Sequence, residues 1–142
     1  MPATVDPYVE SKIMTATPHQ LHLMVVDGAI RYTTAAEEAL RCRDREKAHF
    51  AFDLARRHVA ELIAGLDAEK QPEVVRKLEA LFLFAHRALV DADVQKDPNR
   101  IVDALVVLRM HRETWVALGE KLRSESAPTD SVEAENGFSW SL

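Results

Sequence analysis

The chain has 142 residues, a formal net charge of -5 at pH 7, and a composition of 47% hydrophobic and 29% charged residues. These values fit one ordinary globular domain and exclude a chain that is disordered throughout. Because residues 124–142 contain four acidic side chains and no basic one, the rest of the chain balances 18 basic against 19 acidic side chains. A nucleic-acid-binding protein needs a basic surface, so binding to nucleic acid is not expected.

The composition predicts an all-α fold. The chain has only four glycines, and its β-branched residues do not form the short alternating runs that are typical of strands. It has neither the leader of a signal peptide nor an apolar run of about 18 residues, the length of a membrane span. The single cysteine, Cys42, is expected to be a free surface thiol, as in a reducing cytosol. We therefore expect a cytoplasmic protein without membrane insertion.

An N-terminal segment, residues 1–16, is expected to contain one short helix over residues 8–14, capped by Asp6. Its apolar side chains are Tyr8, Val9, Ile13 and Met14. A helix of this length is not stable alone and needs a surface to pack on. We expect it to cover an exposed apolar surface of the next domain as a lid, which a ligand displaces; the alternative is a permanent part of the fold.

The starts of two long helices are marked by capping residues. The run Thr17-Pro18-His19-Gln20 has a hydroxyl at the N-cap, proline at the first helical position and glutamine where it can bond back to the cap. This first helix should end near residue 41. Asp44 caps a second helix over residues 45–64, where the following Gly65 suits a left-handed C-terminal position.

Two further helices are expected over residues 72–94 and 98–123, the last again marked by an Asp97-Pro98 cap. Short connections between four helices of similar length predict an antiparallel four-helix bundle over residues 17–123. Residues 124–142 are rich in Ser, Glu, Asp and Pro and are expected to form a disordered acidic tail. The tail ends in Phe138 and Trp140, which is unusual for a segment that only needs to be solvated.

Apolar residues at helical spacing predict the core. The expected core positions of the four helices, in order, are Leu21, Val25, Gly28, Tyr32, Ala36 and Ala39; Ala48, Phe52, Ala55, Val59, Leu62 and Ile63; Val74, Leu78, Leu81, Phe82, Ala85 and Leu89; and Ile101, Leu105, Leu108, Trp115 and Leu122.

A second apolar stripe is expected on the outside of the bundle. On the first long helix, Leu23, Val26 and Ile30 lie within about 60° of one another and about 155° from the core direction. The third helix repeats this with Leu83, Val90 and Val94, and the fourth with Val102, Val106 and Met110. Such a patch indicates a binding surface. The alternative is a set of scattered surface hydrophobes.

Catalytic and metal sites are not predicted. A di-iron bundle needs Glu-x-x-His on two helices, whereas only Glu46 and His49 have that spacing. His19 and His22 share a helix start without a third ligand, and His58, His86 and His111 stand singly on three helices. No nucleophile motif or phosphate-binding glycine loop is present. We therefore expect no enzyme, no metal and no cofactor.

Three arginines, Arg41, Arg43 and Arg45, alternate with Asp44 and Glu46 between the first two long helices. A solvated loop explains this pattern. A contact with a phosphate or with a partner protein is the alternative.

Several motifs resemble one family. Tyr8 and Ile13 are followed by Thr15-Ala16-Thr17-Pro18, then by a run from Leu21 to Ile30 that contains Asp27-Gly28-Ala29-Ile30. Further along come Leu66-Asp67, Lys96-Asp97-Pro98 and Trp115. Over about residues 8–122 the sequence resembles the bacterial flagellin export chaperones of the FliS type. Departures from the family pattern are Val26, Phe82 and Phe84 in place of tyrosines and Asp93 in place of asparagine.

The resemblance implies a chaperone that binds the disordered C-terminal segment of flagellin, prevents its premature polymerisation and delivers it to components of the flagellar export gate. The residues expected to contact flagellin are apolar and lie on the short helix or the outward stripes: Tyr8, Ile13, Met14, Leu23, Val26, Ile30, Leu83, Val90, Val106 and Met110. A homodimer seam on the same stripe, an adaptor for another client and a metal-binding bundle enzyme are the alternatives.

Overall fold

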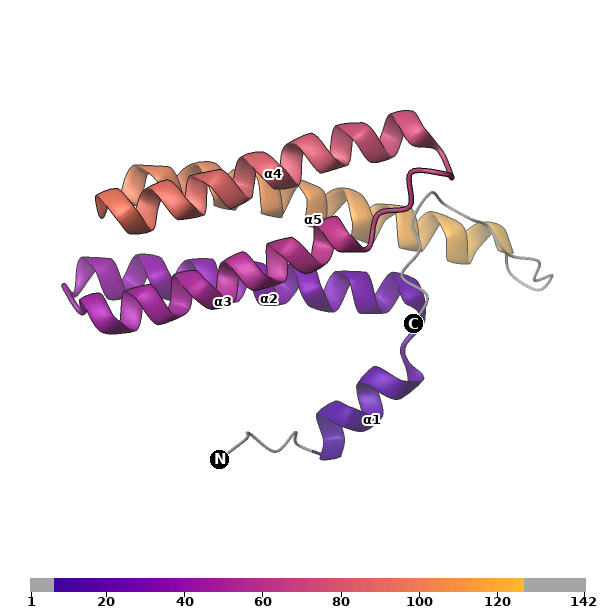
Figure 1. Cartoon of the computed structure of the whole chain (residues 1–142). Coiled ribbons are helices and arrows are strands. Elements are labelled where there is room, and N and C mark those ends of the chain that lie inside the picture. The colour runs from indigo at the N-terminus through magenta and orange to yellow at the C-terminus, as the bar shows by residue number, and fades with distance from the viewer. Residues whose placement is uncertain (1–6, 127–142) are drawn as a thin grey trace.

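The computed structural model describes residues 7–126, which form helices joined by short connections (Figure 1). These are α1 (Pro7–Thr15), α2 (Pro18–Arg41), α3 (Arg45–Ala64), α4 (Pro72–Gln95) and α5 (Pro98–Ser126). In the bundle, α2 and α4 each pack against both α3 and α5. The short helix α1 projects away from the bundle at the start of α2 (Figure 1). The prediction of an all-α, antiparallel four-helix bundle preceded by a short helix is confirmed.

The capping residues act as predicted at the starts of α2 and α3. The Gln20 N–H donates to Thr17 Oγ1 over 3.1 Å, and the Thr17 N–H donates to Gln20 Oε1 over 3.0 Å. The Lys47 N–H donates to Asp44 Oδ1 over 3.1 Å. Because these bonds join neighbours in sequence, the sequence alone was sufficient to place these two helix starts.

Two expectations about helix ends are wrong. Gly65 has a φ of -82°, so the end of α3 does not use a left-handed glycine. Left-handed backbone occurs instead at Arg43, Gln71 and Lys96. The last helix also continues through Ser124 to Ser126, so these residues do not belong to a tail. The rest of the expected tail, from residue 127 onward, lies outside the described residues.

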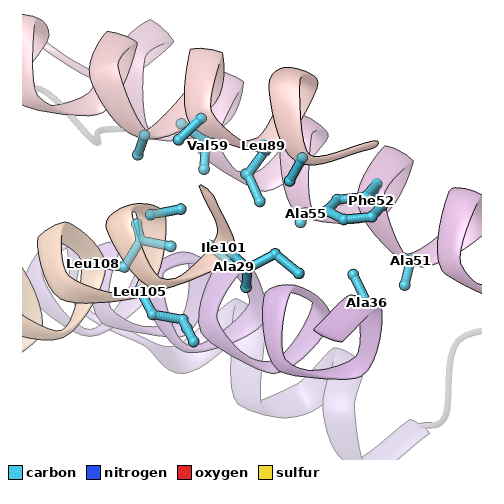
Figure 2. Close-up of a cluster of buried hydrophobic side chains, with 14 of the residues drawn as sticks. Ala29, Ala36, Ala51, Phe52, Ala55, Val59, Leu89, Ile101, Leu105 and Leu108 are labelled. Atoms are coloured by element: carbon cyan, nitrogen blue, oxygen red, sulfur yellow. The ribbon is translucent and has the colours of Figure 1, made fainter. Parts of the chain in front are cut away.

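Side chains from all four long helices fill the core, as Figure 2 shows for residues such as Ala36, Phe52, Leu89 and Ile101. Its largest fully buried apolar side chains are Phe52, Phe82, Leu62, Leu89, Ile101 and Leu108. Alanines occupy many of the remaining core positions, which lets the helices approach closely. Two predicted core residues of α4 are not core: Val74 and Leu81 are 43% and 46% exposed.

A close contact between α2 and α3 requires glycine at position 28. A Cβ atom on Gly28 would lie 2.5 Å from His58 Cδ2 and 2.6 Å from His58 Nε2. The His58 ring is held in place because its Nδ1 donates to Leu54 O over 2.8 Å and the ring lies 5.1 Å from that of Tyr32, tilted by 48°. Gly28 therefore allows the His58 ring to lie directly on the α2 backbone.

Asp93 connects α3 to α4 from a buried position. It is 6% exposed, and its Oδ2 atom accepts hydrogen bonds from His49 Nδ1 at 2.9 Å and Arg56 Nη1 at 3.2 Å. Lys96 Nζ lies 3.5 Å from the other carboxylate oxygen. A buried charge is tolerated when it is paired and hydrogen-bonded in this way. His49, weighed above as a metal ligand, is thus a partner of this carboxylate.

A cluster of His19, His22, His111 and Trp115 joins the start of α2 to the second half of α5. The Nε2 atoms of His22 and His111 lie 2.7 Å apart, so one ring donates an N–H and the other accepts it. The His19 ring stacks on Trp115 at 4.8 Å, and Trp115 Nε1 donates to His19 O over 3.0 Å. His22 is fully buried and His111 is 7% exposed. We call this group the histidine cluster.

Burial holds both core histidines in the neutral form. It lowers the pKa of His22 to about 3, with a further contribution from the charges of His111 and His19, and it lowers the pKa of His111 to about 4. In the unfolded chain both pKa values return to about 6.5. Stability from these groups is therefore complete above pH 6.5 and is lost as the pH falls toward 4.

Replacing Gly28 by Ala should destabilise the protein by about 1–3 kcal/mol, because the new methyl group displaces His58. Helix propensity alone would favour Ala by about 1 kcal/mol. Urea unfolding should show the loss. In a His58→Ala background the same replacement should become neutral or stabilising, and an equal loss in both backgrounds would contradict the role given to His58.

Replacing both His22 and His111 by Gln should flatten the dependence of stability on pH. In the unaltered chain the free energy of unfolding should decrease steadily from pH 6.5 to pH 4, by up to about 1.4 kcal/mol per pH unit for each buried histidine. Denaturant titrations at several pH values measure this slope. An unchanged slope in the double variant would show that other groups cause the acid sensitivity.

Candidate functional site

The outer face of α5 carries a row of exposed apolar side chains. Val102, Val106 and Met110 are 49%, 50% and 62% exposed. Their spacing of four residues places them along one side of the helix, turned away from the buried Ile101, Leu105 and Leu108. We call these three residues the α5 stripe. This part of the predicted outward surface is on the outside of the bundle.

The neighbouring face of α2 is less exposed than predicted. Val26 is fully buried in the core, so its assignment to an outward stripe is wrong. Leu23 and Ile30 are half-buried, and Ile30 packs partly against the core. The predicted rotation of α2 is wrong because two polar residues, His22 and Thr33, are buried in the core. The side of the helix that faces inward therefore includes Val26.

An ion pair spans α2 and α5 beside these residues. Arg112 Nε donates to Asp27 Oδ1 over 2.6 Å, and this bond raises the pKa of Arg112 above its ordinary value. Both side chains are more than 40% exposed. The pair therefore adds little to stability, but it shows that the outer edges of α2 and α5 lie side by side here.

A depression of about 330 Å³ lies at the N-terminal end of α2. Its walls come from the end of α1, the α1–α2 connection and the first turns of α2: Thr15, Ala16, Gln20, Leu23, Met24 and Asp27. Leu23 thus lines a concave site rather than a flat surface. An apolar side chain of a bound segment could enter here.

The outer surface of α4 also carries exposed apolar side chains. Leu83 and Val94 are 50% and 75% exposed, whereas Val90 is half-buried. Leu81 and Phe84 are 46% and 51% exposed. At about 100° per residue, Leu83, Val90 and Val94 share one side of α4, and Phe84 lies about 100° away. The apolar surface of α4 is therefore wider than the predicted stripe.

The short helix α1 does not cover the bundle in this structure. Tyr8 and Met14 are 72% and 79% exposed, and Val9 is 40% exposed. The expectation that α1 packs on the outward stripe is therefore wrong for this conformation. The structure describes Ile13 as part of α1 but does not describe its side chain.

Within residues 7–126, no helix is long and apolar enough to cross a membrane. In the same part of the chain, no group of three or more His, Cys, Asp or Glu side chains is placed to hold a metal ion. Cys42 is exposed and free. The described surface is thus characterised by apolar side chains on its helices rather than by a cluster of reactive groups.

Sequence reasoning missed two features of this surface. The pairing of Asp27 with Arg112 joins residues 85 positions apart and leaves no local signal. The exposure of Phe84 and Leu81 follows from the rotation of α4, which depends on its neighbours. For the ion pair, the available sequence signal was the position of Asp27, which precedes Gly28 within the block that resembles the FliS family.

A comparison with protein families shows to which family this chain is related. The family described as flagellar protein FliS matches residues 1–122. The chain belongs to the FliS family.

Individual relatives agree. The flagellar secretion chaperone FliS of Salmonella typhimurium is 32% identical over 114 residues, which are 80% of this chain and 84% of the relative. The protein of the same name from Bacillus subtilis is 24% identical over 76% of this chain and 80% of the relative. That from Campylobacter jejuni is 27% identical over 76% and 84%. FliS proteins are flagellar secretion chaperones, not enzymes.

A glutamate at Val26 and a glutamate at Val106 should change the stability of the FliS-family bundle by very different amounts. Val26→Glu places a carboxylate in the core and should destabilise the protein by several kcal/mol, enough to unfold much of it. Val106→Glu, on the α5 stripe, should change stability by less than about 0.5 kcal/mol. Thermal unfolding followed by circular dichroism compares them. Equal losses would mean that the α5 stripe belongs to the core.

Proposed function

We propose that this chain is a cytoplasmic chaperone that binds the C-terminal segment of flagellin, keeps flagellin from polymerising and delivers it to the flagellar export apparatus. Membership of a family of flagellar secretion chaperones supports the general role. The observation that carries the specific proposal is the α5 stripe, three exposed apolar side chains in line on the outer face of α5.

The chemistry of the α5 stripe suits an amphipathic helix as its occupant. Such a ligand places apolar side chains at three- and four-residue spacing, which matches the spacing of Val102, Val106 and Met110. Leu23 and Ile30 on α2 extend the apolar area across the Asp27–Arg112 pair. A client helix lying along α5 would therefore bury the stripe and use the α2 depression as an end pocket.

The remaining candidate contacts lie on other elements. Leu83 and Val90 on α4 extend the contact surface around the bundle, so an extended client would have to wrap around it to reach both. On α1, we propose that Tyr8, Ile13 and Met14 contact a bound segment; the side chains of Tyr8 and Met14 are 72% and 79% exposed. Val26 has no place in direct binding because its side chain is buried.

Binding of a disordered client explains why the complex can be released. The client loses chain entropy when it becomes ordered, so a large apolar contact yields only a moderate net affinity. A moderate affinity permits hand-over to components of the export gate. Covering the C-terminal segment would at the same time remove it from contacts between flagellin monomers.

The test is a binding measurement with the flagellin C-terminal segment from the same bacterium. Val106→Glu should weaken binding at least about tenfold, because burying such a side chain contributes about 1.5–3 kcal/mol. The matched control is Phe50→Glu on α3, an equally drastic change at a side chain that is 65% exposed. It should leave the affinity within about twofold.

Equal weakening by both variants, or by neither, would contradict the assignment of the client site. Light scattering of the free protein separates this proposal from a homodimer seam. If Val106→Glu converts a dimer to a monomer without changing client affinity, the stripe serves self-association instead.

A further inference from the structure

The end of the bundle formed by the α2–α3 and α4–α5 turns contains a second hollow, separate from the apolar surfaces. It has a volume of about 270 Å³ and is lined by Leu40, Arg41, Arg43, Arg45, Lys96 and Pro98. Four of these six residues are cationic, and none is acidic. We call this hollow the turn pocket.

Two of the four cations are already engaged with the protein. Arg41 Nη2 lies 3.0 Å from Glu37 Oε2, and Lys96 Nζ donates to Asp93 O over 2.8 Å. Arg43 and Arg45, by contrast, make no ion pair with a carboxylate among the described residues. Asp44, which lies between them in sequence, uses its carboxylate to cap α3, and Glu46, which follows Arg45, makes no ion pair with either arginine among the described residues. Two of the arginines that line the pocket thus have no carboxylate partner within residues 7–126.

Helix stability does not explain all of these charges. Cations are favoured at the C-terminal ends of helices, which accounts for Arg41 and Lys96. Arg45, however, is the first residue of α3, where the helix dipole disfavours a positive charge. Arg43 has a φ of 59°, a conformation in which glycine or asparagine costs less. Neither Arg43 nor Arg45 is therefore the residue that would give its position the greatest stability.

The pocket lies at the end of the bundle where α5 begins, beside Pro98. Because neither Arg43 nor Arg45 pairs with a carboxylate within residues 7–126, both are open to an anionic ligand from solution.

We propose that the turn pocket binds a ligand carrying a phosphate group, held by Arg43 and Arg45. A phosphate dianion offers several terminal oxygens, so it can accept paired hydrogen bonds from two guanidinium groups at once. The size of the hollow suits a compact ligand with one or two phosphate groups. An extended acidic peptide would instead need a groove. The proposal does not depend on the α5 stripe or on the client.

Titration of the full chain with diphosphate and with inorganic phosphate, at constant ionic strength, tests the proposal. Binding should saturate at one site with a Kd below about 1 mM for diphosphate. Amide signals of Arg43 and Lys96 should shift in nitrogen-edited NMR spectra. Arg43→Gly with Arg45→Gln should weaken binding at least about tenfold. The matched control is Arg57→Gln on α3, whose partner is Asp53, and it should bind within about twofold of the unaltered protein.

The double variant should keep its fold, because glycine relieves the left-handed backbone at position 43; Arg45→Gln alone provides a second variant. Absence of saturation, or equal binding by the double variant, would overturn the proposal. Displacement of diphosphate by lower concentrations of a hexaglutamate peptide would also overturn it, in favour of a protein partner. Vesicles carrying a phosphoinositide, compared with free diphosphate, distinguish a lipid headgroup from a soluble source of the same chemistry.

Discussion

The bundle is closed by the contact between the start of α2 and the second half of α5. His19 and Trp115 are 96 positions apart, yet each makes a hydrogen bond to the other's backbone carbonyl while their rings stack. The buried His22–His111 bond lies beside them. Gly119 belongs to the same contact, because a Cβ atom there would collide with His19. This contact fixes the rotation of α5, and with it the residues that α5 presents to solvent.

That rotation connects the core to the surface. Once Ile101, Leu105, Leu108 and Trp115 point inward, Val102, Val106 and Met110 must point outward. The core is filled without them, by alanines and a few large side chains, so packing of the core does not require their apolar character. Helix α5 therefore carries apolar residues on two faces: one face packs in the core, and the other is available to a ligand. A single helix can carry both because its charged residues separate the two faces.

The sequence predicted the features that depend on neighbours along the chain. The Thr17 capping box and the Asp44 cap involve residues three positions apart, and both form as expected. Features that depend on rotation between helices were less accessible. Val74 and Leu81 lie at the edge of the apolar face of α4, where a small change in helix phase reverses burial. Val26 was misplaced because the inward face of α2 includes two buried polar residues, His22 and Thr33. The His22–His111 and Asp27–Arg112 contacts join α2 to α5 across 89 and 85 positions, so no local sequence pattern predicts them.

Methyl NMR of the full chain with the flagellin C-terminal segment tests the central claim most directly. If the outer face of α5 is the client site, the methyl signals of Val102, Val106 and Met110 should shift in a saturable manner. Those of the buried Val59 and the exposed Val74 provide a core and a surface reference. Shifts that are largest on α5 are the expected result. Saturable binding that leaves all three α5 methyl signals unchanged would show that the client binds elsewhere.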